Sequence, residues 1–174
     1  LHKFNPVRIK FFTEHLAFNF AKNKNIKLLD IGCGGGLVSE SLATLGYEVT
    51  GIDVVAENII TAKNHAKFNN LNITYLNQSI EEHLKSHTRH YDVVICSEVI
   101  EHIKNPKVFL HYIDQIRKRD SLVFITTINR TVKSLLTAKF AAEYILQWLP
   151  KGTHDWNKFI KPCEIIDFSE DTEL

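Results

Sequence analysis

A short apolar run that ends in a cluster of glycines constrains the fold of this chain most. The run spans residues 28–31 (LLDI), and glycines occupy four of the next five positions, 32–36. Residues 37–45 then have helical spacing. Because glycine lets a backbone approach a ligand closely, and because amides at a helix start attract anions, this order predicts a buried strand, a ligand-binding turn and a helix.

The same alternation of strand and helix continues along the chain. We expect strands at 28–31, 48–53, 73–76, 91–96 and 122–127, and helices at 7–20, 37–45, 56–68 and 106–117. The run YDVVIC at 91–96 is continuously apolar, which is typical of a parallel strand buried on both faces. The pattern predicts an α/β fold, a Rossmann-like doubly wound and mostly parallel sheet.

An acidic residue ends the second expected strand. Asp53 stands where such folds place a carboxylate that accepts the ribose hydroxyls of a bound nucleoside. A dinucleotide fingerprint that begins at Gly32 requires a third glycine at position 37, which here is Leu37. The pattern therefore favours a nucleoside-bearing cofactor other than NAD, and an NAD oxidoreductase stays as an alternative.

The end of the third expected strand supplies further candidates for cofactor contacts. Ser79 and Ile80 lie at the carboxyl edge of the sheet, where ligands bind at the switch point of such folds. A backbone amide near Ile80 could bind the adenine ring, with Val54 packed on its face. For Ser79 alone, a structural role is as good an explanation as a binding role.

Composition narrows the class of protein. With 174 residues and 44% hydrophobic residues, the chain is long enough for one domain with a real core. Its formal net charge of +1 provides no field that would attract nucleic acid over the whole surface. The cysteines Cys33, Cys96 and Cys163 are scattered, which favours structural thiols in a reducing compartment.

Several segments resemble one family of enzymes. They are LHKFNPVR at 1–8, LLDIGCGGG at 28–36, GIDV at 51–54, EEH at 81–83, SEVIEHI at 97–103, INR at 128–130, AAEYIL at 141–146 and PKGTHDWNKFIKP at 150–162. The chain thereby resembles the ubiquinone-biosynthesis O-methyltransferases, which are class I S-adenosylmethionine-dependent methyltransferases. The resemblance implies methyl transfer from S-adenosylmethionine to a hydroxyl of a polyprenylated catechol.

The resemblance also implies cofactor contacts. They fall at Arg8, Gly32, Asp53 and Ser97, with Gly34 in the same glycine turn. An arginine at position 8 suits the methionine carboxylate of the cofactor, because a guanidinium binds a carboxylate through two parallel hydrogen bonds.

Glu98, Glu101 and His102 are the candidates for the acceptor side of the site. They share one face if a helix begins there, and the resemblance associates such a trio with a divalent metal, Mg²⁺ or Zn²⁺. A purely structural brace is the alternative. Deprotonation of the catechol needs a base, and the catalytic candidates are His102, Glu98, Glu101 and His154.

An amphipathic segment follows the last expected strand. Residues 132–161 combine an apolar helical stripe, tryptophans and lysines, which is typical of peripheral membrane contact, although the stripe could equally pack on the domain. Because a polyprenyl acceptor stays in a membrane, we expect the protein on the cytoplasmic face of the inner membrane in a bacterium. In a mitochondrion we expect it on the matrix side of the inner membrane. A ubiquinone-biosynthesis complex is a further expected partner.

We divide the chain into one domain, residues 1–174, in four parts. These are a helical cap at 1–27, a cofactor-binding core at 28–129, an amphipathic insertion or lid at 130–162 and a truncated C-terminal part at 163–174. The chain begins at Leu1 and has no methionine, so we expect a fragment that lacks the C-terminal strands of its class. Two alternatives stay open: a methyltransferase for another small molecule, and a noncatalytic subunit.

Overall fold

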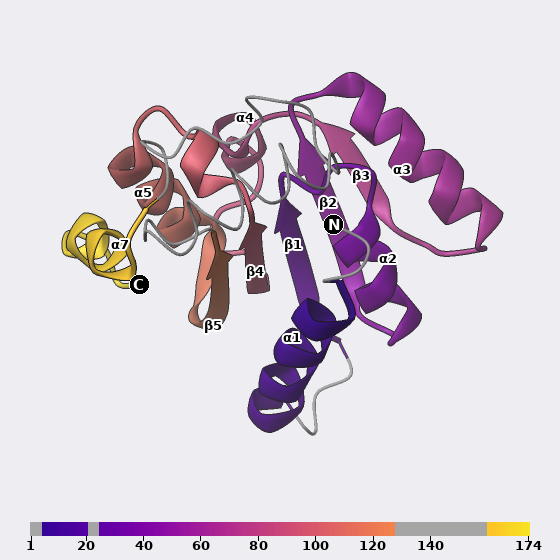
Figure 1. The fold of residues 1–174 in the computed structure, drawn as a ribbon, viewed down its shortest axis with the longest axis horizontal. Coiled ribbons are helices and arrows are strands. Elements are labelled where there is room, and N and C mark those ends of the chain that lie inside the picture. Colours follow the sequence, from indigo (N-terminus) through magenta and orange to yellow (C-terminus); the bar gives the residue numbers. More distant parts are fainter. Residues whose placement is uncertain (1–4, 21–24, 128–159) are drawn as a thin grey trace, which may run out of the picture.

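A computed structural model describes residues 5–20, 25–127 and 160–174, and it shows a parallel sheet with helices on both faces (Figure 1). The strands are β1 (Lys27–Ile31), β2 (Glu48–Asp53), β3 (Thr74–Asn77), β4 (Tyr91–Ser97) and β5 (Arg117–Thr126). They lie in the order β3-β2-β1-β4-β5, and every pair of neighbours is parallel. The predicted α/β, Rossmann-like fold class is confirmed.

The order of the strands reverses at β1. The chain adds β2 and β3 on one side of β1, then crosses over to add β4 and β5 on the other side. In the central register, Ile31 at the end of β1 lies between Ile52 and Cys96. In open α/β sheets, ligands bind beyond the carboxyl ends of the strands at such a reversal. The fold therefore places a binding crevice directly after Ile31, where the glycine turn begins.

Helices precede and follow the strands, and the one that begins at Pro106 has residues that suit a helix start. They are α1 (Asn5–Phe20), α2 (Leu37–Thr44), α3 (Ala56–Phe68), α4 (Ile80–Leu84), α5 (Pro106–Ile116) and α7 (Pro162–Ser169), with a 3-10 turn, η1, at Ile100–His102. At the start of α5, the Asn105 side chain accepts the amide of Val108, and Pro106 occupies the first turn. In the part of the chain that the structure describes, no helix has the length and apolar character needed to cross a membrane.

Alternate residues of the central strands point to opposite faces, and both faces are buried. Leu28, Val93 and Ile95 pack with α1 and α2, whereas Leu29 and Val94 pack with α5. A third cluster joins α3 to Tyr75 of β3. The continuous apolar runs seen in the sequence are thus strands covered on both sides, as expected for a parallel sheet.

Three elements differ from the sequence expectation. β5 begins at Arg117, five residues before the expected position 122, and its pairing with β4 is shifted between Tyr91 and Val93. The helix α4 was not expected because five residues carry no helical period, and α7 lies in the part read as a truncated end. The four-part division of the domain stays a prediction.

A buried histidine connects α4 to the start of β4. The ring of His83 is fully buried, its Nδ1 accepts a hydrogen bond from the Gln78 amide, and its Nε2 lies 2.7 Å from the Tyr91 hydroxyl. It stacks on His87 with 4.2 Å between ring centroids. Burial, with the charges of His87 and His90, lowers the pKa of His83 from 6.5 to about 4.

We expect His83 to make the fold less stable in acid. Between about pH 6.5 and 4 the unfolded chain binds a proton at His83 that the folded chain excludes, so folding weakens as the pH falls. His83→Gln is less stable than wild type at pH 7. That deficit should narrow by about 1.4 kcal/mol per pH unit on acidification, as measured by urea unfolding. A deficit that does not change with pH contradicts the assignment.

Candidate active site

The glycine turn after β1 has a backbone that only glycine adopts readily. Gly32, Gly34 and Gly36 have φ values of +67°, +54° and +88°. A side chain at Gly32 would collide with Val99, and one at Gly36 would collide with the Tyr75 hydroxyl. No atom lies within 4 Å of the Cβ position at Gly34. The turn is therefore packed at both ends and open at its centre, as a ligand-binding turn requires. We call this turn, residues 32–36, the cradle.

The carboxylate of Asp53 closes the rim of this cradle. Its Oδ2 accepts the amide of Gly34 at 2.9 Å and its Oδ1 accepts the amide of Val55 at 2.8 Å. The backbone carbonyl of Asp53 accepts the Asn77 side-chain amide at 2.9 Å, which joins the ends of β2 and β3. Each carboxylate oxygen can accept a second hydrogen bond, so the group can hold two adjacent hydroxyls.

Sequence reasoning missed a second acid at the site, Asp30. It is 2% exposed, and the Ser39 hydroxyl of α2 donates to it at 2.6 Å. Burial raises its pKa from 3.8 to about 6, against the Ser39 hydrogen bonds and the nearby positive charge of Arg8. A lone acid in the apolar run LLDI was the signal that could have revealed it.

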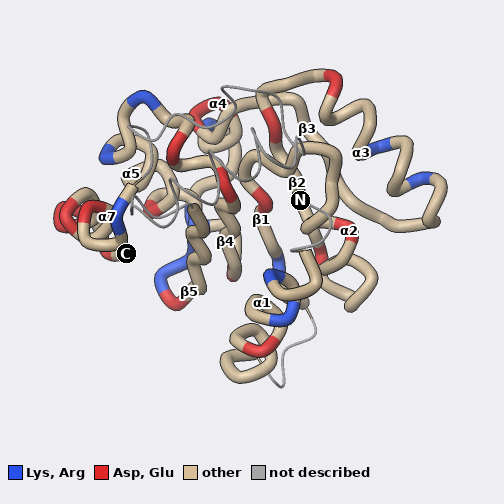
Figure 2. The backbone as a smooth tube through the Cα atoms, viewed as in Figure 1, with Lys and Arg blue, Asp and Glu red and all other residues tan. Residues whose placement is uncertain are grey.

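Arg8 reaches the same crevice from α1. Its guanidinium lies 3.9 Å from Glu98, and the two side chains are 18% and 28% exposed. Figure 2 shows acidic positions gathered near the carboxyl ends of the central strands. Arg8 is a cation with two acidic neighbours, Glu98 and Asp30, so a zwitterionic amino-acid group would find partners here for both of its charges.

The turn between β3 and α4 supports the cradle from the side. The Ser79 hydroxyl caps α4 by accepting the amide of Glu82 at 3.2 Å, while the Glu82 carboxylate accepts the Ser79 amide at 2.8 Å. These bonds favour the structural role for Ser79. Ile80 is buried, and Val54 is 70% exposed at the rim.

The predicted helical face of Glu98, Glu101 and His102 is wrong. Glu98 has a φ of +58° outside any helix, and only Ile100–His102 form a short 3-10 turn. Glu101 is 7% exposed, whereas His102 is exposed. Within 5–20, 25–127 and 160–174 no three His, Cys, Asp or Glu side chains form a group that could hold a metal ion. The trio does not fit the implied metal, so we derive no step through one.

Ser97 lies at the end of β4, at the same edge of the sheet as the cradle. The Ser97 hydroxyl is half-buried at the end of β4 and lies 2.8 Å from the Thr126 hydroxyl. His154 and most of the 132–161 segment lie outside the described residues. The structure thus brings Arg8, the glycine turn, Asp53 and residues 97–98 to one edge of the sheet.

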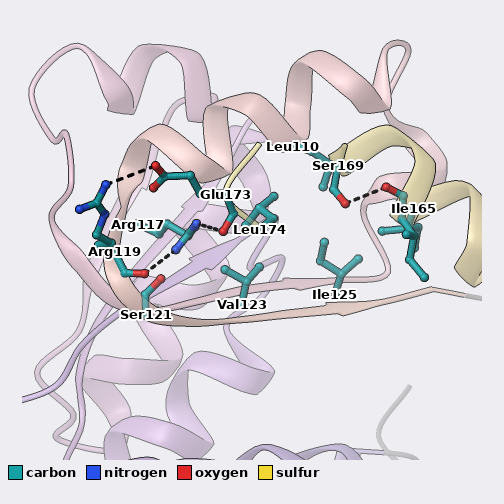
Figure 3. Close-up of a pocket in the computed structure, with 11 residues that line it drawn as sticks. Leu110, Arg117, Arg119, Ser121, Val123, Ile125, Ile165, Ser169, Glu173 and Leu174 are labelled. Atoms are coloured by element: carbon teal, nitrogen blue, oxygen red, sulfur yellow. Dashed lines mark hydrogen bonds and ion pairs between the residues drawn. The ribbon is translucent and has the colours of Figure 1, made fainter. Parts of the chain in front are cut away.

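A cavity of about 560 Å³ lies elsewhere, between one face of β5 and the helices α5 and α7 (Figure 3). Its apolar lining includes Leu110, Val123 and Ile165, from α5, β5 and α7. Arg119 at its rim lies 3.5 Å from Glu173. None of the predicted site residues lines this cavity, so we place the active site at the crevice after β1.

The open centre of the cradle leads to a prediction with a matched control. Gly34 and Gly46 both have positive φ and no atom within 4 Å of a Cβ position, but Gly46 lies at the end of α2. Alanine at either position should destabilise the fold by about 1 kcal/mol. Only Gly34→Ala should also weaken binding of S-adenosylhomocysteine, about tenfold or more, in calorimetric titration. Equal affinities in the two variants would place the ligand elsewhere.

Comparison with known proteins defines the class. A family profile described as a methyltransferase domain matches residues 4–166. The solved structure of the plantazolicin methyltransferase BamL, in complex with a triazolic desmethylPZN analog and SAH, aligns with a TM-score of 0.76 at 20% identity. The match covers 95% of this chain and 60% of that one. The fold is that of the class I S-adenosylmethionine-dependent methyltransferases, and S-adenosylmethionine is the cofactor of this methyltransferase domain.

Sequence comparison identifies the family. The ubiquinone biosynthesis O-methyltransferase of Pelagibacter ubique is 45% identical over 100% of this chain and 74% of its own length. The enzyme of the same name from Rickettsia bellii is 42% identical over 100% of this chain and 72% of its own length. The chain belongs to the ubiquinone biosynthesis O-methyltransferase family. The resemblance stated from the sequence motifs is confirmed.

Proposed function

We propose that the chain transfers the methyl group of S-adenosylmethionine to one hydroxyl of a polyprenylated catechol in ubiquinone biosynthesis. The observation that carries this proposal is the 45% identity that extends over the whole chain to a relative of that name. The fold supports it, because the cradle and the acidic turn after β4 lie at the same edge of the sheet.

The cofactor end of the site is formed by the first two strands. Gly32 lets the turn begin close against Val99, Gly34 leaves the nucleoside room to approach the backbone, and Asp53 accepts the ribose hydroxyls. Val54 and the amide near Ile80 hold the adenine. An amide in the first turn of a helix has no intrahelical acceptor, which leaves it available for this contact.

The methionine end lies between α1 and β4. Arg8 binds the carboxylate of the cofactor, in exchange for its present contact with Glu98. Ser97 contacts the cofactor near its sulfonium group, because Ser97 directly precedes the turn that carries Glu98 and Glu101.

The cofactor supplies an electrophilic methyl group on a sulfonium sulfur. A phenolic oxygen attacks this carbon, the O–C bond forms as the S–C bond breaks, and the electron pair of that bond stays on sulfur. The phenolic proton passes to a base. Glu98 and Glu101, in the turn that follows β4, are our first candidates for this base, and His102 and His154 are the others.

The acceptor test uses a catechol with a short prenyl tail. Incubation with S-adenosylmethionine should yield the monomethyl ether and S-adenosylhomocysteine in equal amounts. The matched control acceptor has hydrogen in place of the reacting hydroxyl and should give neither product. Tight binding of S-adenosylhomocysteine without turnover of the catechol would favour another acceptor or a noncatalytic subunit.

A membrane location follows from the chemistry of this acceptor, because a polyprenyl tail stays in a bilayer. We place the chain on the cytoplasmic face of the inner membrane in a bacterium, or on the matrix side in a mitochondrion, with 132–161 as the contact and a biosynthetic complex as partner. Leu135→Glu with Ile145→Glu should reduce sedimentation with liposomes. Unchanged sedimentation of the folded variant would contradict this contact.

A further inference from the structure

Two consecutive threonines end the last strand of the described sheet. β5 ends at Thr126, and Thr127 follows directly. In a continuing strand their side chains would point to opposite faces. Because the strand stops at Thr126, both hydroxyls instead reach acidic residues of the segment after β4.

The hydroxyl of Thr126 is part of a chain of hydrogen bonds. Thr126 lies directly beside Ser97 in the register of β4 and β5, with 2.8 Å between their hydroxyl oxygens. It also donates to the Glu98 carboxylate at 3.3 Å. A hydroxyl has one hydrogen and a carboxylate has none, so Ser97 must donate to Thr126.

The backbone fixes Glu98 at the same place. The Glu98 amide donates to the Thr126 carbonyl at 2.8 Å, and Glu98 has the left-handed φ of +58°. Such a conformation persists in a non-glycine residue only where the surroundings hold it, and it is common at active sites. Thr126 of β5 therefore holds Glu98 at two points, through its carbonyl to the Glu98 amide and through its hydroxyl to the Glu98 carboxylate.

Thr127 has the corresponding contact with Glu101. Its hydroxyl donates to Oε2 of Glu101 at 2.9 Å, and Glu101 is 7% exposed within η1. A buried carboxylate needs such a donor, because removal from water penalises its charge. Each threonine thus holds one of the two glutamates.

We infer that Thr126 and Thr127 are positioning residues for methyl transfer. They fix the Glu98 and Glu101 carboxylates at the acceptor side of the cradle, so that one of the two receives the phenolic proton. This inference rests on the proposed function for the identity of the acceptor. The hydrogen bonds that carry it are independent of that identity.

The test compares side chains that differ only by a hydroxyl group. Thr126→Val and Thr127→Val keep the shape of threonine, while Thr126→Ser and Thr127→Ser keep the hydroxyl. We expect kcat on the short-tail catechol to fall about 10- to 100-fold in at least one valine variant, and to recover in the matching serine variant. Affinity for S-adenosylhomocysteine should stay within about twofold of wild type in Thr127→Val.

Thr44→Val is the control, because the hydroxyl of the exposed Thr44 donates only to the Glu40 carbonyl within α2. It should leave kcat unchanged. If a valine variant does not fold, the alanine and serine variants at the same position still differ by the hydroxyl alone. Full kcat in both hydroxyl-free variants overturns the inference.

A crystal structure of Thr127→Val with S-adenosylhomocysteine separates this inference from the proposed function. A displaced Glu101 carboxylate supports the positioning role even if wild type does not methylate the catechol, in which case only the proposed function fails. A Glu101 carboxylate that stays in place in the variant contradicts the positioning role.

Discussion

Asp53→Ala should weaken binding of S-adenosylhomocysteine by about 100-fold or more. The carboxylate accepts two loop amides, from Gly34 and Val55, and we assign it both ribose hydroxyls of the cofactor. A hydrogen bond to a charged group contributes about 1.5–3 kcal/mol, so losing two of them accounts for a loss of this size. Calorimetric titration of the folded variant measures it.

The control for Asp53 is an acid with similar bonds at the opposite edge of the sheet. Asp92, at the start of β4, accepts the Lys27 amide at 3.0 Å and the Lys118 ammonium at 2.7 Å. Asp92→Ala should lower the unfolding free energy but keep the affinity for S-adenosylhomocysteine. Equal affinities in Asp53→Ala and wild type would remove Asp53 from the site.

Asp30→Asn should stabilise the fold at neutral pH, by at most about 3 kcal/mol. Burial raises the pKa of Asp30 from 3.8 in the unfolded chain to about 6 in the folded one. The folded chain therefore holds a proton that the unfolded chain releases, and this contribution to stability is lost as the pH rises through about 6. Asparagine has no charge to bury, and its carbonyl still accepts the Ser39 hydroxyl, but its NH2 group is a new buried donor and reduces the gain.

The pH dependence of this effect is diagnostic. The advantage of Asp30→Asn should shrink as the pH falls from about 6 towards 4, where Asp30 itself is protonated in the folded chain. His83 acts in the opposite direction over nearly the same range, so the variant should lose stability in acid more steeply than wild type. Urea unfolding at several pH values measures both slopes. A variant less stable than wild type at pH 7 contradicts the assignment.

The stability that the buried Asp30 carboxylate costs at neutral pH indicates a role for Asp30 in cofactor binding. Asp30 lies next to the cradle and near Arg8, and a buried acid that lowers stability at neutral pH is typical of a site where function opposes stability. We expect Asp30→Asn to bind S-adenosylhomocysteine more weakly than wild type, despite its higher unfolding free energy.

The cofactor half of the site could be predicted from the sequence because its signals are local. The glycine turn and the acid at the end of β2 are each specified within a few residues, and the alternating elements fix which strand ends meet. Asp53 accordingly ends β2 as expected, and it also accepts the Gly34 amide, which the sequence did not predict. Its role towards the ribose hydroxyls stays a prediction.

The acceptor side could not be predicted in the same way, because it depends on contacts between distant segments. The spacing of Glu98 and Glu101 suggested a helix, but the hydrogen bond from Glu98 to Thr126 of β5 holds the backbone out of one. The role of Thr127 depends on a residue 26 positions away. No periodicity within residues 97–103 carries that information.

A crystal structure of the chain with S-adenosylhomocysteine is the most direct test of the central claim, that the segment from β1 to β2 holds the cofactor. We expect both ribose hydroxyls within hydrogen-bonding distance of the Asp53 carboxylate, and the amino-acid carboxylate at Arg8. A nucleoside bound away from Gly34 and Asp53 would contradict the account.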